Sequence, residues 1–211
     1  YLENLRRENP AAALAQLKNV WKEESYTTRA AFLKTLEINL SENDEAFLET
    51  CLNDRRKEVR LVAIELLRQL PNTGLSKRVV AMLDDFVQYS PTSDELSVIL
   101  PEKCTDAMKK NGVQARYRPL PDEGKRANCL AQLLALVPPS HWCQTWQKTP
   151  QELLRLVAQS DWDKLFMWAW AKAAVFQQDE DWLLACHEFY VDTQYNKRWI
   201  KLSLDFMYEG L

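Results

Sequence analysis

Glycine is scarce in this chain: there are only four in 211 residues, whereas roughly 7% of residues is typical. β-Hairpins, phosphate-binding loops and dinucleotide-binding folds use glycine where the backbone needs a positive φ or must approach a ligand closely. The shortage of glycine therefore argues against those folds. It favours helices that are joined by short polar turns.

The sequence also lacks an excess of basic residues. It has 27 lysines and arginines against 30 aspartates and glutamates, which gives a formal net charge of −3. Proteins that bind nucleic acids usually carry a basic excess, because neutralising phosphates supplies much of their affinity. The overall charge therefore does not favour nucleic-acid binding, although a local basic patch remains compatible with it.

The cysteines form no CxxC pair, which removes the usual signature of a zinc ribbon or a thioredoxin-type motif. Free thiols in a reducing cytoplasm are expected for all five, which are Cys51, Cys104, Cys129, Cys143 and Cys186.

No apolar run approaches the ~20 residues of a membrane-spanning helix, and no signal peptide is recognisable. We expect no membrane association. Because the chain starts at Tyr1 without a methionine, we expect a domain excised from a longer protein.

Apolar residues recur with helical spacing over most of the chain, and the breaks carry helix-capping residues or prolines. Helices are expected at 9–23, 25–40, 42–52, 54–70, 75–89, 122–137 and 140–147, and then from positions 150, 160, 179 and 196 onward. Residues 91–121 contain four prolines and break the pattern. We therefore predict helical pairs over 1–90, an irregular insertion over 91–121 with a short helix near 105–110, and a tryptophan-rich helical portion over 122–211 in the same continuous array.

The first four helices repeat with an offset of about 31 residues, which aligns Leu17 with Leu48. The stretch from Asp54 through Val59-Arg60 to Leu66-Leu67 resembles the second helix of a HEAT repeat, most clearly over 42–75. This resemblance implies an all-α fold of stacked antiparallel helix pairs, an α-α superhelix interrupted by the one insertion. It also implies that Asp54 and Arg60 join a ladder of contacts between adjacent repeats.

A second resemblance rests on the Asn-Pro-Ala-Ala-Ala-Leu opening at 9–14 and the Asp-Arg-x-x-x-Val-Arg stretch at 54–60. Both are similar to an uncharacterised bacterial family associated with gene neighbourhoods that hold a MoxR-type AAA ATPase. The resemblance implies a protein partner, in an AAA ATPase system.

Tryptophan is frequent: there are eight, and seven of them lie between Trp142 and Trp199. They could line an aromatic groove, but packing between helices is the more common role of such residues. Trp162, Phe166 and Trp170 are spaced by four residues and form one buried stripe of a helix. Trp168 lies on another side of that helix and is the best candidate for an exposed aromatic residue at an interface.

The sequence offers only weak candidates for metal-binding or catalytic residues. His141 and His187 are the only histidines, and adjacent residues such as Cys186 and His187 diverge by about 100° on a helix, which prevents them from sharing a metal. A Cys–His nucleophile pair, Cys143 with His187 or Cys186 with His141, remains open. The paired acidic residues mostly sit at helix starts, where they favour the helix dipole. We therefore expect no enzyme activity, metal or cofactor.

The leading hypothesis is a non-enzymatic, cytoplasmic scaffold that binds a protein partner. The residues expected to contact this partner are exposed basic and aromatic ones: Arg55, Arg56, Arg116, Tyr117, Arg118 and Trp168. The alternative is a nucleic-acid-binding HEAT-like protein, similar in fold type to one family of DNA glycosylases, although no catalytic motif of that family matches specific positions.

Overall fold

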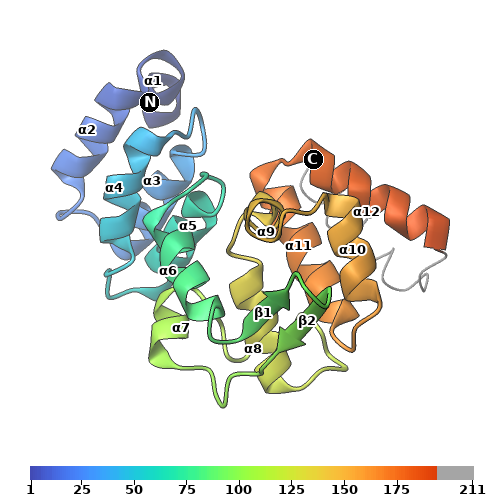
Figure 1. Ribbon diagram of the computed structural model, residues 1–211. Helices are drawn as coiled ribbons and strands as arrows, with labels where there is room; N and C mark the ends of the chain where they lie inside the picture. Colours follow the sequence, from blue (N-terminus) through green and yellow to red (C-terminus); the bar gives the residue numbers. More distant parts are fainter. Residues whose placement is uncertain (194–211) are drawn as a thin grey trace. The chain divides into compact units, whose positions relative to one another are not determined.

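A computed structural model describes residues 1–193 of the chain, with side chains through Val191. The described part is mostly helical, as Figure 1 shows, so the all-α expectation is confirmed. The elements are α1 (Leu2–Glu8), α2 (Pro10–Val20), α3 (Tyr26–Thr35), α4 (Glu42–Cys51), α5 (Lys57–Leu67), α6 (Gly74–Leu83), β1 (Val87–Ser90), β2 (Glu95–Val98), α7 (Asp106–Lys110), α8 (Lys125–Leu134), α9 (Pro139–Trp146), α10 (Pro150–Ala158), α11 (Asp163–Gln177) and α12 (Glu180–Thr193). The helix expected from position 196 lies outside the described residues, as does Trp199.

The chain divides into two compact units. Unit 1 comprises Tyr1–Leu75 with Lys110–Gly112, and unit 2 comprises Ser76–Lys109 with the chain from Val113 onward. These boundaries do not coincide with the predicted ones at 90 and 121. Within residues 1–193, no helix combines the length and the apolar character that crossing a bilayer requires.

In unit 1, local capping signals set the helix starts. The Asn9 side chain accepts a hydrogen bond from the Ala12 N–H at the start of α2. At α4, Ser41 and Asp44 form a capping box. Helix α3 packs against α5, and α4 packs against α5. Trp21, just after α2, meets Phe47 of α4 edge to face, so consecutive helix pairs bury their apolar faces against each other in this unit.

A buried ion pair connects α1 to the start of α4. The guanidinium of Arg6 lies 3.0 and 2.9 Å from the two carboxylate oxygens of Asp44, and both side chains are 1% exposed. Arg6 also donates hydrogen bonds to the backbone carbonyls of Pro10, Leu36, Ile38 and Asn39. Both buried charges therefore have a partner and several hydrogen bonds, which is the condition under which burying them is tolerable.

The two residues that the HEAT resemblance assigned to a ladder make contacts of different kinds. The carboxylate of Asp54 lies 3.1 Å from the Arg29 guanidinium of α3, in the preceding helix pair. Arg60 instead donates to the backbone carbonyls of Asp54 and Arg55, next to its own helix. Asp54 also accepts a hydrogen bond from the Arg56 N–H, and α5 starts only at Lys57, three residues after the expected start at position 54.

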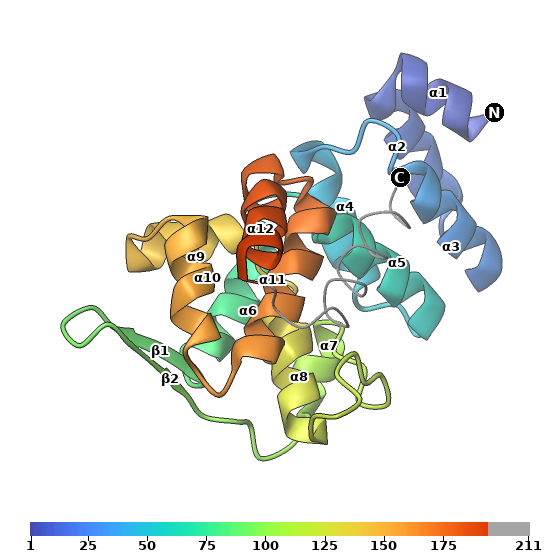
Figure 2. The same cartoon turned by 90° about the vertical axis from the view of Figure 1, so that its right-hand side faces the viewer.

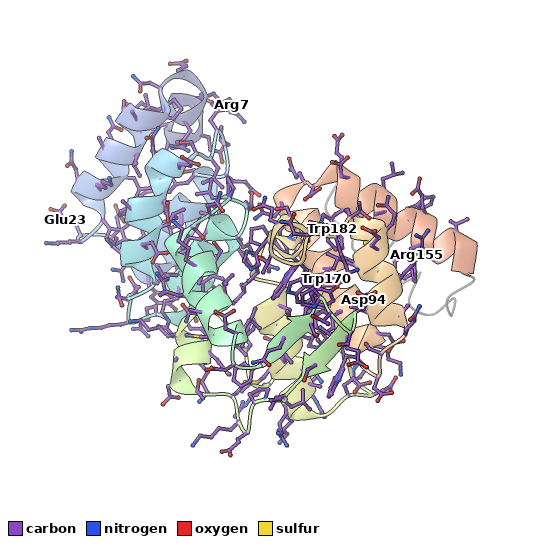
Figure 3. All side chains as sticks on the ribbon, viewed as in Figure 1. Arg7, Glu23, Asp94, Arg155, Trp170 and Trp182 are labelled. Atoms are coloured by element: carbon purple, nitrogen blue, oxygen red, sulfur yellow. A yellow bond between two sulfur atoms is a disulfide. The ribbon has the colours of Figure 1, made fainter. Side chains whose placement is uncertain are left out.

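In unit 2, α11 packs against α8, α9, α10 and α12. Aromatic rings run through this interior: Trp170 lies 5.2 Å from Trp182 and 6.4 Å from Trp146 between ring centroids, and Figure 3 shows Trp170 and Trp182 together. The chain of rings continues from Trp146 to Tyr89 of β1, at 5.3 Å. The tryptophans of this unit are thus mainly core residues, and they also attach the two-stranded sheet to the helices.

The expected helix over 75–89 ends at Leu83, because residues 87–98 form a β-hairpin instead. Strands β1 and β2 are antiparallel, with Gln88 paired to Ser97 and Ser90 to Glu95. We expected the shortage of glycine to argue against hairpins, and for this segment that expectation is wrong. Asp94 supplies the positive φ, at 55°, that closes the loop, and aspartate tolerates this conformation better than most residues.

The segment that follows the hairpin is held along α8 by side chains of that helix. Arg126 donates to the carbonyls of Leu100 and Pro101. Asn128, which is 1% exposed, accepts from the Leu120 N–H and donates to the Leu120 carbonyl, both at 2.8 Å. Gln132 in the same way accepts from the Gln114 N–H and donates to its carbonyl. The region predicted as an irregular insertion is therefore ordered by polar contacts, and it includes the expected short helix, α7.

A disulfide joins Cys104 to Cys129 of α8, so the expectation of five free thiols is wrong for these two. They are 25 residues apart, and only the path of the intervening segment brings their Cα atoms to 6.0 Å. The other cysteines carry free thiols. Burial raises the pKa of Cys51 and of Cys186 to about 12 in each case, and it also raises the pKa of the half-buried Cys143.

The number of cysteines that an alkylating reagent modifies should reflect this arrangement. In denaturant without a reductant we expect three of the five cysteines to react with iodoacetamide, and all five after reduction. In the native protein, Cys51 and Cys186 should stay unmodified because they are buried and protonated, and Cys143 should react first. Peptide mass spectrometry identifies the sites. Five reactive thiols in the denatured, unreduced protein would contradict the disulfide.

Candidate functional site

A hollow beside the hairpin is the candidate site in unit 2. It has a volume of about 590 Å³, within the usual range of ligand-binding pockets. Its walls come from both strands, from the end of α10 and from the turn before α11, and they comprise Gln88, Tyr89, Ser90, Asp94, Glu95, Leu96, Ser97, Leu156, Gln159, Ser160, Asp161 and Trp162. Figure 2 shows the hairpin running alongside α9 and α10, with its closing loop extending beyond them. We call this hollow the hairpin cavity.

One end of the hairpin cavity is fixed by three polar side chains. The Tyr89 hydroxyl donates to Asp94 Oδ1 at 2.7 Å, and Lys148 Nζ lies 2.9 Å from the same oxygen. Lys148 also lies over the Tyr89 ring, 5.5 Å from its centroid. Lys148 sits immediately before Thr149, whose capping box with Glu152 starts α10. The beginning of α10 therefore holds the loop of the hairpin, whose Asp94 is labelled in Figure 3.

These contacts shift the ionisation of all three groups. The Tyr89 hydrogen bond, and then Lys148, lower the pKa of Asp94 below its ordinary value. The Asp94 carboxylate in turn raises the pKa of Tyr89 and of Lys148. Because the pKa of Asp94 is lower in the folded chain, the ionised Asp94 carboxylate contributes stability to the hairpin loop. This contribution is fully present at pH values above the ordinary carboxyl pKa. That contribution is lost as the pH falls through the lowered value.

Replacing Tyr89 with phenylalanine should raise the pKa of Asp94 toward its ordinary value, because it removes the strongest of the interactions that lower it. The ring, and with it the contact to Trp146, is retained. Carboxyl ¹³C chemical shifts followed against pH measure this pKa. The control is Ser93→Ala, an exposed position in the same loop, which should leave the titration unchanged. An unaltered pKa in Tyr89→Phe would show that the hydroxyl does not act on Asp94.

The opposite wall of the hairpin cavity is a turn that places Trp162. Ser160 Oγ donates to the Val157 carbonyl at 2.8 Å and accepts from the Trp162 N–H at 3.2 Å. This hydroxyl closes the end of α10 and fixes the backbone on which the indole sits. Trp162 is half-buried, whereas Phe166 and Trp170 of the same expected stripe are fully buried. The stripe is therefore confirmed for two of its three residues, and Trp162 faces the cavity instead.

The basic residues predicted to contact a partner are exposed. Arg55 and Arg56 lie before α5 in unit 1, and Arg56 stacks on the Tyr26 ring at 4.7 Å. Arg116, Tyr117 and Arg118 lie together on the segment between α7 and α8 in unit 2. Arg118 donates to the Glu123 carbonyl at 3.3 Å. None of these five residues lines the hairpin cavity.

Trp168 is not an exposed interface residue, so that prediction is wrong. It is 7% exposed, because α11 is enclosed by four other helices and has buried residues on all its sides. Most residues of such a helix are buried whatever their angular position, so angular placement relative to Phe166 cannot indicate exposure. The indole N–H of Trp168 finds no hydrogen-bond partner among the described residues.

The Cys–His pairs left open by the sequence lack the properties of a nucleophile. Burial raises the pKa of Cys143 and of Cys186, whereas a reactive thiol needs a lowered pKa. Burial also lowers the pKa of His141, and Asp84 opposes this shift only in part. Among the described residues, no three His, Cys, Asp or Glu side chains gather in a way that could hold a metal ion.

Sequence reasoning did not identify the residues of the hairpin cavity. Asp161 was interpreted as an acidic residue at a helix start, Trp162 fitted a core stripe, and Glu95 was not singled out. The polar alternation of Gln88, Ser90, Glu95 and Ser97, at every second position of two short segments, is the signal that could have revealed a strand pair with one solvent-facing side.

Comparison with known proteins gives one result. Searches among curated proteins and among solved structures found no match. A model of a family of unknown function, DUF5691, matches residues 1–202, which is nearly the whole chain. The chain therefore belongs to the DUF5691 family.

Proposed function

We propose that this chain is a non-enzymatic module that binds a protein partner, and that the hairpin cavity is part of its contact surface. The observation that carries the proposal is the cavity itself, open to solvent and about 590 Å³ in volume. Its wall combines strand, helix end and turn, and it mixes aromatic with polar side chains. Interfaces typically use aromatic residues for contact area, with polar groups at the rim.

The arrangement suits binding better than chemistry. Two charged groups meet at the hairpin loop, and their contacts stabilise Asp94 as a carboxylate and Lys148 as a cation. A general acid or base works best with a pKa near the working pH, and both shifts move these groups away from neutrality. The contacts among Tyr89, Asp94 and Lys148 therefore serve to hold the shape of the surface.

The proposal also includes the HEAT-like stacking of helix pairs, which the packing of α3 on α5 supports in unit 1. The partner that the second sequence resemblance suggests is a component of an AAA ATPase system. A cytoplasmic location is part of the same proposal, although the disulfide removes the argument from free thiols.

A photo-crosslinking experiment in the native cells tests the proposal. Benzoylphenylalanine replaces Ser97, which is exposed and lines the hairpin cavity, and in a control it replaces Gln144, which is exposed on α9 and does not line it. We expect a discrete protein adduct from position 97 that is absent from position 144. Mass spectrometry then identifies the adduct and shows whether it is an ATPase. No adduct at position 97, or the same adducts at both positions, would count against the proposal.

Nucleic-acid binding is a second proposal, favoured by the exposed Arg116-Tyr117-Arg118 segment in unit 2. Basic side chains with an interleaved aromatic can contact phosphates and stack on bases. In an electrophoretic mobility assay, binding should weaken steeply as salt increases, and Arg116→Ala with Arg118→Ala should weaken it further. If no mobility shift occurs even at low salt, this second proposal is excluded.

A further inference from the structure

The carboxylates of the hairpin cavity divide into one that is neutralised and two that are not. Asp94 is paired with Lys148 and accepts a hydrogen bond from Tyr89. The side chains of Glu95 in β2 and Asp161 in the turn before α11 make no hydrogen bond or ion pair with any described residue. No lysine or arginine is among the described residues that line the cavity. Among the described residues, the lining of the cavity therefore carries two carboxylates that no cation pairs with.

The Trp162 indole gives the same cavity an aromatic wall. Its backbone is held by Ser160, and its side chain is half-buried. Within the part of the chain that the structure describes, its ring makes no aromatic or cation–π contact, unlike Trp142, Trp146 and Trp170, which contact one another or their neighbours. The face of an indole attracts cations, and among side chains arginine is the cation most often found there.

From these observations we infer that the hairpin cavity binds an arginine side chain of an extended segment of the partner protein. This inference rests on the proposed function and names the chemistry that the partner presents. A guanidinium is planar and has five N–H donors, so it can bond to a carboxylate in bidentate fashion and stack on an aromatic ring at the same time. The hydroxyls of Ser90 and Ser97 and the carboxamide of Gln88 can accept hydrogen bonds from donors that the carboxylates leave unused.

The size and charge of the cavity fit this occupant better than the alternatives. A volume of about 590 Å³ has room for a long side chain together with adjoining backbone. A lysine would gain from the negative charge, but it lacks the planar, forked geometry. A phosphate or a nucleic-acid backbone would be repelled by Glu95 and Asp161, neither of which forms an ion pair with a described residue.

The test uses the full chain and four fluorescein-labelled peptides, Gly-Ser-Gly-Xaa-Gly-Ser-Gly, in which Xaa is arginine, lysine, citrulline or glutamate. A single-stranded RNA octamer serves as a further probe. Fluorescence anisotropy measures binding at low salt, and ¹H–¹⁵N spectra of the indole groups identify the tryptophan involved. We expect binding in the order arginine, lysine, citrulline, with a shift of the Trp162 indole signal. The citrulline peptide should bind at least about tenfold more weakly than the arginine peptide, because it lacks the positive charge.

Two variants locate the site. The double variant Glu95→Gln with Asp161→Asn keeps the shape of the two side chains and removes their charge. It should weaken binding of the arginine peptide by about tenfold or more. The matched control is Glu102→Gln, an exposed carboxylate of the same unit that does not line the cavity, and it should bind like the wild type. Thermal unfolding of all three proteins shows that the differences are not due to loss of fold.

Several outcomes would overturn the inference. These are equal binding of the arginine and citrulline peptides, tighter binding of the RNA, an unchanged Trp162 signal, or an unaffected double variant. The crosslinking experiment at Ser97 does not depend on arginine. An adduct there with no arginine preference would overturn this inference and leave the proposed function standing, whereas no adduct at all would remove both.

Discussion

Replacing Arg6 with alanine should destabilise unit 1 by about 3–5 kcal/mol, because it leaves the Asp44 carboxylate buried without its cation. The same change removes the donors that satisfy four backbone carbonyls, and three of these, at Leu36, Ile38 and Asn39, lie between α3 and α4. Urea unfolding of the full chain, followed by hydrogen exchange of peptides from α1 and α4, measures the loss and localises it to these helices.

Arg7→Ala is the matched control for this change. Arg7 is the next residue in the same helix, but its side chain is exposed and donates a 3.3 Å hydrogen bond to the side chain of Asn4. Its removal should alter stability by no more than about 0.5 kcal/mol. A double replacement, Arg6→Met with Asp44→Leu, should be less destabilising than Arg6→Ala alone, because no buried charge is left unpaired. If Arg6→Ala and Arg7→Ala have equal effects, the buried pair does not stabilise the unit as described.

Asn128→Ala should destabilise unit 2 by about 3 kcal/mol, since it leaves buried backbone groups of the preceding segment without partners. Asn128 forms hydrogen bonds with both the N–H and the carbonyl of Leu120, which is fully buried, and with the carbonyls of Glu123 and Gly124. Limited proteolysis should cut the variant within residues 113–124 faster than the wild type. Urea unfolding gives the change in free energy.

Lys125→Ala controls for a substitution near the start of α8, because Lys125 is exposed. It should change stability by about 0.5 kcal/mol or less and leave the proteolysis rate unchanged. The disulfide at Cys129 adjoins Asn128, so the comparison is made with the bridge intact and again after reduction. If the Asn128→Ala protein resists proteolysis in both states, the asparagine does not hold this segment.

Features set by residues close in sequence could be predicted. The capping boxes at Ser41 and Thr149 and the Asn9 cap depend on partners three residues away, and all are present. The apolar stripe of α5 likewise needs only helical periodicity, and its residues are buried. Such local signals placed most of the helices within a few residues of their observed bounds.

Features that depend on distant partners could not be predicted. Arg6 resembles any surface arginine until the chain brings Asp44 against it. The hairpin has no Asn-Gly or Asp-Gly turn signal, and apart from the short polar alternation of its strands only pairing across the loop distinguishes it from a helix end. The hairpin cavity in turn requires the strands, α10 and the turn before α11 to be positioned first, and for that reason no local pattern brought Glu95, Asp161 and Trp162 together as one site.

The ion pair between Arg6 and Asp44 also bears on the order in which the chain acquires its structure. The two residues are 38 positions apart, so the ribosome synthesises the α1 segment well before it adds Asp44, the counterion of Arg6. A helix of seven residues is too short to be stable in water by itself. We expect the first helix to stay unformed during synthesis until α4 is available. The α1 segment would then be among the last parts of its unit to fold, although it is synthesised before α4.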